Sequence, residues 1–179
     1  MSERKSETRK RILAVAGREL VERGPTDPAV AEVMAAAGLT VGGFYAHFAS
    51  KEALMLEAFE QLLRIRRERL TRVDRRLSGR ERRVLVAAFY LSRKHRDDAA
   101  ERCPLPSSLS EVERLPAGFR QVLARHVELT AAQMSDAPEE ADAALADLAL
   151  MVGGLALARA LGPGELSDRL LRAAKSAVI

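Results

Sequence analysis

The first 50 residues are divided by residues that end and begin helices, and this division constrains the fold most strongly. Gly24-Pro25 ends an apolar periodicity over residues 8–23, because the glycine after the last turn precedes a residue that cannot continue a helix. Asp27-Pro28 supplies an N-cap and a proline at the first helical position. Gly38-Leu39-Thr40 closes this second segment, and Thr40 caps a third. The pattern predicts helices over residues 8–23, 28–37 and 40–48, the last two forming a helix-turn-helix.

The rest of the chain also has a helical pattern. Ala, Leu, Arg and Glu dominate, and no stretch alternates apolar and polar residues for long enough to predict a strand. Between Gly, Pro and Ser interruptions, apolar periodicity predicts helices over residues 51–77, 80–97, 117–135, 138–161 and 164–178, with a further helix start near 103–107. We therefore expect an all-α fold of about nine helices.

The composition is that of a soluble globular protein. Of 179 residues, 47% are hydrophobic and 30% charged, which excludes a disordered chain. The single cysteine excludes an intrachain disulfide framework and suggests a reducing compartment. The longest uncharged apolar run, residues 148–158, is shorter than the ~20 residues that span a bilayer. Because the N-terminus is charged and lacks an apolar signal core, we expect a cytoplasmic protein without a membrane partner.

Positive charge is concentrated in two segments. Residues 1–11 hold five Lys or Arg against two Glu, and residues 64–83 hold ten Arg against three acidic residues. Since the whole chain carries only +4, the remainder is net negative. A polyanion partner would require such an asymmetry, although a solvated helix face explains an Arg run equally simply. The N-terminal run is either an arm that reaches a minor groove or a frayed terminus.

Aromatic residues cluster in the third predicted helix. Phe44, Tyr45 and Phe48 are three of the seven aromatic residues and lie within five positions. A small domain has little interior, so we expect Phe44 and Phe48, one turn apart, to face its core. Tyr45 and His47 then fall on the opposite side, together with Thr40, Val41 and Gly43.

The segment AEVMAAAGLTVGGFYAHFASKEALMLEAF, residues 31–59, strongly resembles the DNA-binding domain of tetracycline-repressor-like (TetR family) transcriptional regulators. Residues 8–20, TRKRILAVAGREL, resemble the first helix of that domain. The resemblance implies a homodimer that binds a palindromic operator, with a DNA-binding domain over residues 1–50. It also implies a helical domain over residues 51–179 that dimerises and binds a small-molecule effector, and repression is the family's usual mode.

The resemblance assigns DNA contact to four residues of this chain: Thr40, Tyr45, His47 and Lys51. The sequence departs from the family pattern at Val41, where a polar or basic side chain is frequent, and at the paired glycines Gly42-Gly43. We therefore expect a recognition helix poor in hydrogen-bond donors. Its readout would depend on Val41 against thymine methyl groups, on phosphate positioning and on DNA shape, while Gly43 leaves a groove-facing position without a side chain.

The C-terminal part offers a candidate dimer face and a candidate ligand pocket. The last two predicted helices carry leucines and small residues suited to a four-helix bundle around a two-fold axis, although the same residues could close a monomer's core. The pocket would be walled by apolar side chains, with two polar ones: Met55, Phe59, Phe89, Tyr90, Met151, Arg93 and His95. Core packing explains most of these residues equally well, and the sequence suggests surface positions for His95 and His126.

Cys103 lies in RCPLPSSL, residues 102–109, which looks like an element of one family branch that includes cysteine-based responders to electrophiles. Beside Arg102, its thiol could have a lowered pKa and act as a sensor, or it could be buried and inert. A cysteine-dependent enzyme that used His95 or His126 as a base is the alternative from another class, but no third orienting group accompanies it. We expect no catalytic site, no metal site and no cofactor.

Overall fold

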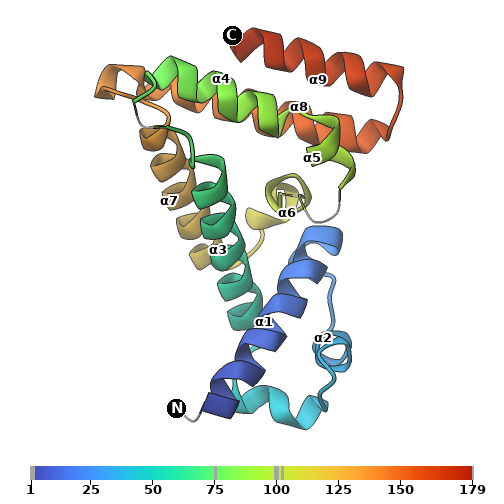
Figure 1. The fold of residues 1–179 in the computed structure, drawn as a ribbon. Helices are drawn as coiled ribbons and strands as arrows, with labels where there is room; N and C mark the ends of the chain where they lie inside the picture. The colour runs from blue at the N-terminus through green and yellow to red at the C-terminus, as the bar shows by residue number, and fades with distance from the viewer. Residues whose placement is uncertain (1–2, 75, 99–100, 102, 179) are drawn as a thin grey trace. The chain divides into compact units, whose positions relative to one another are not determined.

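The computed structural model describes residues 3–74, 76–98, 101 and 103–178. Within these ranges the chain is helical, and no strand occurs. The helices are α1 (Glu3–Arg23), α2 (Val30–Ala36), the 3-10 helix η1 (Val41–Ala46), α3 (Lys51–Leu70), α4 (Gly79–Tyr90), α5 (Arg93–Asp97), α6 (Leu105–Val112), α7 (Ala117–Gln133), the 3-10 helix η3 (Pro138–Glu140), α8 (Ala141–Leu161) and α9 (Glu165–Val178). The predicted all-α fold with an N-terminal helix-turn-helix is confirmed (Figure 1).

The chain divides into two compact units. Unit 1 comprises Met1–Leu63 and Ser107–Leu123, and unit 2 comprises Arg64–Pro106 and Ala124–Ile179. The functional boundary predicted at residue 50 lies within unit 1 and remains a prediction.

In unit 1, α1 packs on α2, and α2 packs on η1. Gly17 of α1 lies against the Leu62 side chain of α3. The core of the unit consists of fully buried side chains from each of these helices: Ile12, Leu20, Val33, Phe44, Leu54 and Phe59. Phe119 of α7 joins this core, with its ring centroid 5.8 Å from that of Phe59. Three helices this short can form a stable module only because they share one core.

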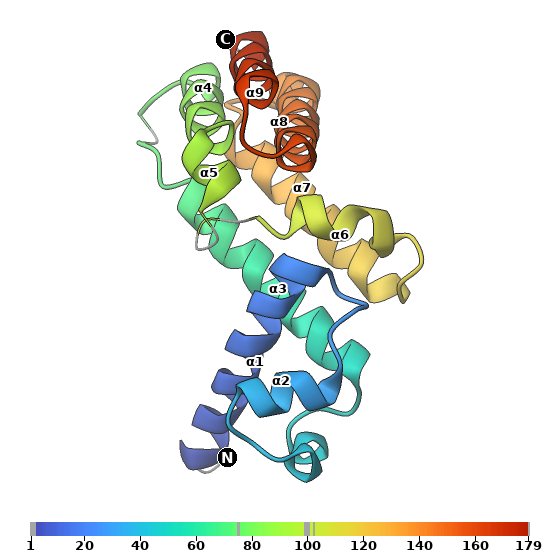
Figure 2. The ribbon, with the colours of Figure 1, turned by 90° about the vertical axis from the view of Figure 1, so that its right-hand side faces the viewer.

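Unit 2 contains the helices α4, α8 and α9, which pack side by side (Figure 2). Gly154 allows this packing, since a Cβ there would lie 3.1 Å from the Ala174 side chain and 3.2 Å from Leu91. Pro138–Leu161 is long and apolar enough to cross a bilayer by composition, with a mean hydropathy of 1.7. Because α8 within it packs against both α4 and α9, it is a core helix of the unit.

Two predicted helices are shorter than their patterns indicated. The helix expected over residues 51–77 ends at Leu70, and the helix expected over residues 80–97 is broken after Tyr90. Ser92 causes a new start, because its hydroxyl accepts a hydrogen bond from the His95 backbone N–H at 3.1 Å and caps α5. The predicted third helix forms as a 3-10 helix, which fits the poor helix propensity of Gly42-Gly43.

Part of the Arg-rich stretch has a structural role. Arg82 is buried and donates to the backbone oxygens of Gln133 and Ser135 at 3.1 and 2.9 Å. Arg83 is also buried and forms ion pairs with Glu140 at 3.1 Å and Asp147 at 3.0 Å. These two arginines join the start of α4 to the end of α7 and the start of α8, so they are not available to a polyanion.

Candidate nucleic-acid interface

The candidate interface is built on η1 and the turn before it. Gly38 adopts the left-handed backbone conformation that a tight reversal requires, with φ +66°. Thr40 then precedes η1 in an extended conformation, with φ −83° and ψ 148°, and its side chain makes no capping hydrogen bond. The Thr40 hydroxyl is therefore not used by the helix that it precedes.

Phe44 of η1 and Phe48, two residues after its end, anchor this segment to the core of unit 1. Phe44 is fully buried and Phe48 is 4% exposed, and their rings stack with centroids 5.9 Å apart. The Arg9 guanidinium lies over the Phe48 ring at 4.5 Å and forms a two-pronged ion pair with Glu57. The hydrogen bonds to Glu57 raise the pKa of Arg9. Sequence reasoning placed both phenylalanines in the core but missed Arg9, which no local pattern distinguishes from its basic neighbours.

The other side of η1 is open to solvent. Tyr45 is 73% exposed and Val41 is 47% exposed, although both side chains are large. Gly42 is exposed and faces open space, since a Cβ built on it would meet no atom within 4 Å. Gly43 is half-buried, and the buried Met34 side chain fills the space beside it, 3.9 Å from where a Cβ would be.

His47 and Lys51 flank this surface. His47 is half-buried and ends η1, where its backbone N–H donates to Phe44 at 2.9 Å. Lys51 opens α3 after Ser50, whose hydroxyl accepts from the Ala53 N–H at 3.1 Å. The Lys51 ammonium donates a hydrogen bond to the Thr26 carbonyl oxygen in the loop between α1 and α2. All six predicted DNA-contact residues thus come from η1, its flanks and the first turn of α3, within unit 1.

The N-terminal basic run, residues 1–11, also belongs to unit 1. It is helical from Glu3 onward, and its cationic side chains are mostly exposed. Arg9 is the exception, because it is tied to Glu57 and Phe48.

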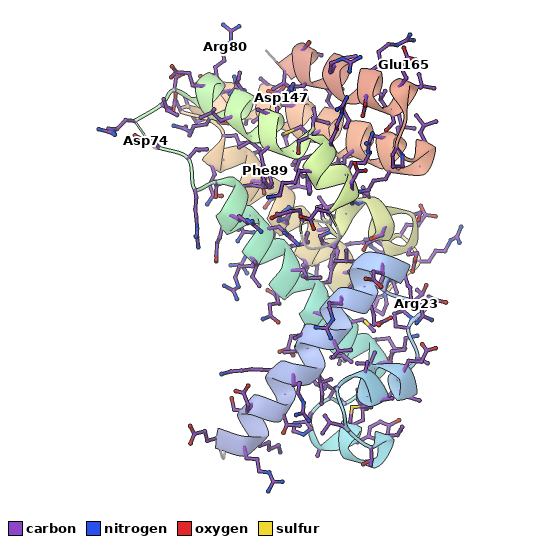
Figure 3. The ribbon with its side chains drawn as sticks, turned by 45° about the vertical axis from the view of Figure 1, so that its right-hand side comes forward. Arg23, Asp74, Arg80, Phe89, Asp147 and Glu165 are labelled. Atoms are coloured by element: carbon purple, nitrogen blue, oxygen red, sulfur yellow. The ribbon has the colours of Figure 1, made fainter. Side chains whose placement is uncertain are left out.

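The predicted ligand-pocket residues are distributed over both units. Met55 and Phe59 are buried in unit 1, and Met151 is buried in unit 2. Arg93 is exposed and pairs with Asp168 at 2.6 Å. The other three, Phe89, Tyr90 and His95, line a cavity in unit 2. Cys103, also a candidate ligand contact, lines the same cavity together with Arg66, Arg69, Leu70 and Glu101. Figure 3 shows Phe89 on α4. This cavity of about 10 Å³ has room for about one water molecule, far less than a small-molecule site needs.

The environment of Cys103 opposes a reactive thiolate. The side chain is 2% exposed, and its burial raises the pKa of the thiol, although Tyr90 and Arg159 act in the opposite direction. Burial also raises the pKa of the Tyr90 phenol well above its ordinary value. Of the two alternatives for Cys103, this conformation fits the buried, inert thiol and not the lowered pKa. Arg102, to which a lowered pKa was attributed, lies outside the described residues.

The expected surface positions of His95 and His126 are also wrong. They are 2% and 4% exposed, and burial lowers the pKa of each to about 4. His95 Nδ1 lies 2.9 Å from the Tyr90 carbonyl oxygen, and its ring packs edge-on against Tyr90 with centroids 4.5 Å apart. The polarity of the two side chains favoured surface positions, but the fold buries both. Among the described residues, no three His, Cys, Asp or Glu side chains are grouped to hold a metal ion.

Comparison with known proteins identifies the module that carries this surface. Residues 12–58, from the core of α1 to the first half of α3, match the family described as "Bacterial regulatory proteins, tetR family". This match identifies residues 12–58 as a TetR-family DNA-binding module. The matched segment contains every predicted DNA-contact residue.

A curated relative and several solved structures are also similar to this chain. An uncharacterized helix-turn-helix transcriptional regulator of Bacillus subtilis, YerO, is 28% identical over 97 residues, which are 51% of this chain. The match spans about a third of that relative, 34% of its length. Solved structures share the fold over nearly the whole chain. Reduced NemR from E. coli has a TM-score of 0.78 at 23% identity, with 96% of this chain and 95% of that chain covered. A TetR-family regulator from Agrobacterium tumefaciens also scores 0.78, at 16% identity, with 97% and 98% covered.

Proposed function

We propose that this TetR-family protein is a cytoplasmic repressor that binds a palindromic operator as a homodimer and is released by a small-molecule effector. The observation that carries the DNA-binding part is the surface of η1. Val41 and Tyr45 are held in solvent by a segment whose other side is locked into the core through Phe44 and Phe48. A folded monomer gains nothing from exposing these side chains, whereas a major groove would accept them.

The residues divide into two roles. Thr40, Tyr45, His47 and Lys51 would donate hydrogen bonds to phosphates and so position the protein. Val41 would contact thymine methyl groups and so contribute sequence preference, while Gly43 leaves the backbone bare. The readout is poor in side-chain donors to bases, which leaves a larger share to DNA shape.

The dimer would form through α8 and α9. Leu148, Val152 and Leu155 are buried within the monomer, so the core explanation holds for these three. Large apolar side chains nevertheless remain exposed along both helices: Leu145, Leu157, Leu161 and Leu166 at 39%, 57%, 53% and 56%. Gly153 is exposed on α8 with no neighbour within 4 Å, which would let a second copy approach closely. Two such helix pairs would form a four-helix bundle.

Sedimentation equilibrium tests the dimer. Leu157→Glu should yield a folded monomer, because the Leu157 side chain is 57% exposed and lies outside the core of unit 2. Leu155→Glu is not a suitable variant, because Leu155 is fully buried and its replacement would unfold the chain. A Leu157→Glu protein that remains dimeric would place the interface elsewhere.

Selection from a random duplex library tests the DNA-binding part, because it requires no knowledge of the operator. The wild-type protein should select a palindrome. Val41→Ala should then relax the base preference, whereas Lys51→Ala should weaken binding to selected and scrambled duplexes alike and reduce the salt slope by about one. Equal losses from both variants on both duplexes would contradict the division into base readout and phosphate contact.

A thiol-based response through Cys103 is the alternative mode of release. The buried thiol with its raised pKa does not favour it. N-ethylmaleimide should therefore leave the protein bound to its selected duplex, and release that is abolished by Cys103→Ser would establish the thiol route instead.

A further inference from the structure

The loop between α1 and α2 is held by two side chains that are distant in sequence. Glu111 of α6 accepts a hydrogen bond from the Thr26 backbone N–H at 3.0 Å and a second from the Thr26 hydroxyl. From the other side, the Lys51 ammonium donates to the Thr26 carbonyl oxygen. A single loop residue therefore connects α6 to the first turn of α3, and all three residues lie in unit 1.

The chain around Thr26 is shaped for this contact. Gly24 has φ +79°, and a Cβ at that position would overlap the Glu111 carboxylate and lie 3.2 Å from the Ser107 carbonyl oxygen. Glycine is thus required for α6 to approach the loop. Arg23, at the end of α1 (Figure 3), forms ion pairs with Asp27 and with Glu32 at 3.0 Å, which fixes the far side of the loop.

This arrangement fixes the direction of Lys51. A lysine side chain has several rotatable bonds, and ordering it on a phosphate costs conformational entropy. The Thr26 carbonyl accepts one of the three ammonium hydrogens, so the side chain is already ordered while two donors remain for a phosphate. The position of that carbonyl depends in turn on Glu111.

We propose that Glu111 is a positioning residue for DNA binding, which acts through Thr26 on Lys51. The inference rests on the proposed role of Lys51 as a phosphate contact. The proposal predicts that removing the negative charge of Glu111 lowers the affinity for DNA, the opposite of what charge alone would do. Glu111 is an anion, so removing its charge should strengthen binding to a polyanion if electrostatics alone matter. If Glu111 positions Lys51, its removal should weaken binding.

A double-mutant cycle between Glu111 and Lys51 tests the proposal, with the full-length protein titrated on the duplex that the wild type selects from a random library. Glu111→Ala should weaken binding about threefold to tenfold and lower the salt slope, as Lys51→Ala does. In the Lys51→Ala background, Glu111→Ala should cause almost no further loss. Glu113→Ala is the charge-matched control, since Glu113 is exposed and lies 3.9 Å from Arg114, and it should leave affinity unchanged or slightly higher.

A merely structural role for Glu111 would lower affinity equally in both backgrounds, and this independence would overturn the proposal. Binding by Glu111→Ala that equals or exceeds that of the wild type would also overturn it. Thr26→Ala and Thr26→Ser provide a second route if Glu111→Ala is unstable, because only serine retains the hydroxyl donor and should restore affinity. Loss of the Lys51→Ala effect itself, or a wild type that selects no duplex, would instead refute the proposed function on which this inference depends.

Discussion

The two tyrosines of this chain occupy opposite environments, although each has a histidine close by in sequence. Tyr45 is 73% exposed on η1, two residues before the half-buried His47. Tyr90 is 1% exposed at the end of α4, where the His95 ring packs against it. Their contact geometries differ as well, because Tyr45 rests edge-on against Phe44 at 5.2 Å and leaves the rest of its ring in solvent.

A tyrosine with a nearby histidine can therefore lie on an exposed surface or in a core. The packing around the pair, and not the residue types, decides between the two. The Tyr90 cluster makes its contacts within the monomer and raises or lowers the pKa of its members through burial. The Tyr45 surface makes few contacts of its own and is supported from beneath by phenylalanines. Substitutions should therefore affect stability in the first region and DNA binding in the second.

Truncating the two tyrosines should separate these effects most strongly. Tyr90→Ala should lower the free energy of unfolding by about 3–5 kcal/mol, because it leaves a cavity where a large buried ring was. Tyr45→Ala should change it by about 0.5 kcal/mol or less, since the side chain is mostly in solvent. Urea unfolding monitored by circular dichroism measures both. Comparable losses of stability would mean that Tyr45 belongs to the core of unit 1.

Acid should destabilise the protein through its buried histidines. The pKa of His95 and of His126 is about 4 in the folded chain, against about 6.5 when unfolded. Above pH 6.5 both states are neutral and stability is unaffected. As the pH falls from 6.5 to 4, only the unfolded state gains protons, so each histidine should cost about 3 kcal/mol by pH 4.

The free energy of unfolding, measured as a function of pH for the wild type and for His126→Gln, checks the predicted loss of stability in acid. The variant should show a shallower fall in stability between pH 6.5 and 4 than the wild type. Parallel curves for the two proteins would show that His126 takes up its proton without unfolding.

Gly42→Ala should raise the stability of the protein and lower its affinity for DNA. Gly42 has a backbone conformation open to any residue and open space around it, so alanine should raise stability by up to about 1 kcal/mol through helix propensity. The added methyl group lies on the surface proposed to face DNA and should weaken binding about tenfold. Gly164→Ala is the matched control, because its Cβ also meets nothing within 4 Å but lies between α8 and α9. An unchanged operator affinity for Gly42→Ala would show that DNA does not approach η1 closely.

The sequence predicted the helices that are bounded by strong signals. Gly24-Pro25 and Gly38 end α1 and α2 close to the predicted residues, and the burial of Phe44 and Phe48 followed from their spacing. It could not predict that Ser92 would cap a separate α5, because residues 92–97 contain no Gly or Pro that would mark a break in the helix. Nor could it place His95 and His126 inside, since their burial depends on helices that are far away in the chain.

The residues of the proposed DNA-contact surface could be chosen from the sequence for a similar reason, whereas the contacts that support them could not. Thr40, Val41, Tyr45, His47 and Lys51 lie in one local motif, whose geometry follows from short-range spacing. The Glu111–Thr26–Lys51 connection spans 85 residues between its first two members, and no local pattern points to it. The predicted ligand-pocket residues were chosen by type and not by contact, and the structure distributes them over both units.

Titration of the full-length protein and of Tyr45→Ala on the duplex that the wild type selects tests the central claim most directly. The account predicts that the wild type binds a palindrome with a steep salt dependence, and that Tyr45→Ala binds more weakly while its unfolding curve overlays that of the wild type. A wild type that ignores every duplex at low ionic strength, or a Tyr45→Ala protein that binds as tightly as the wild type, would contradict it.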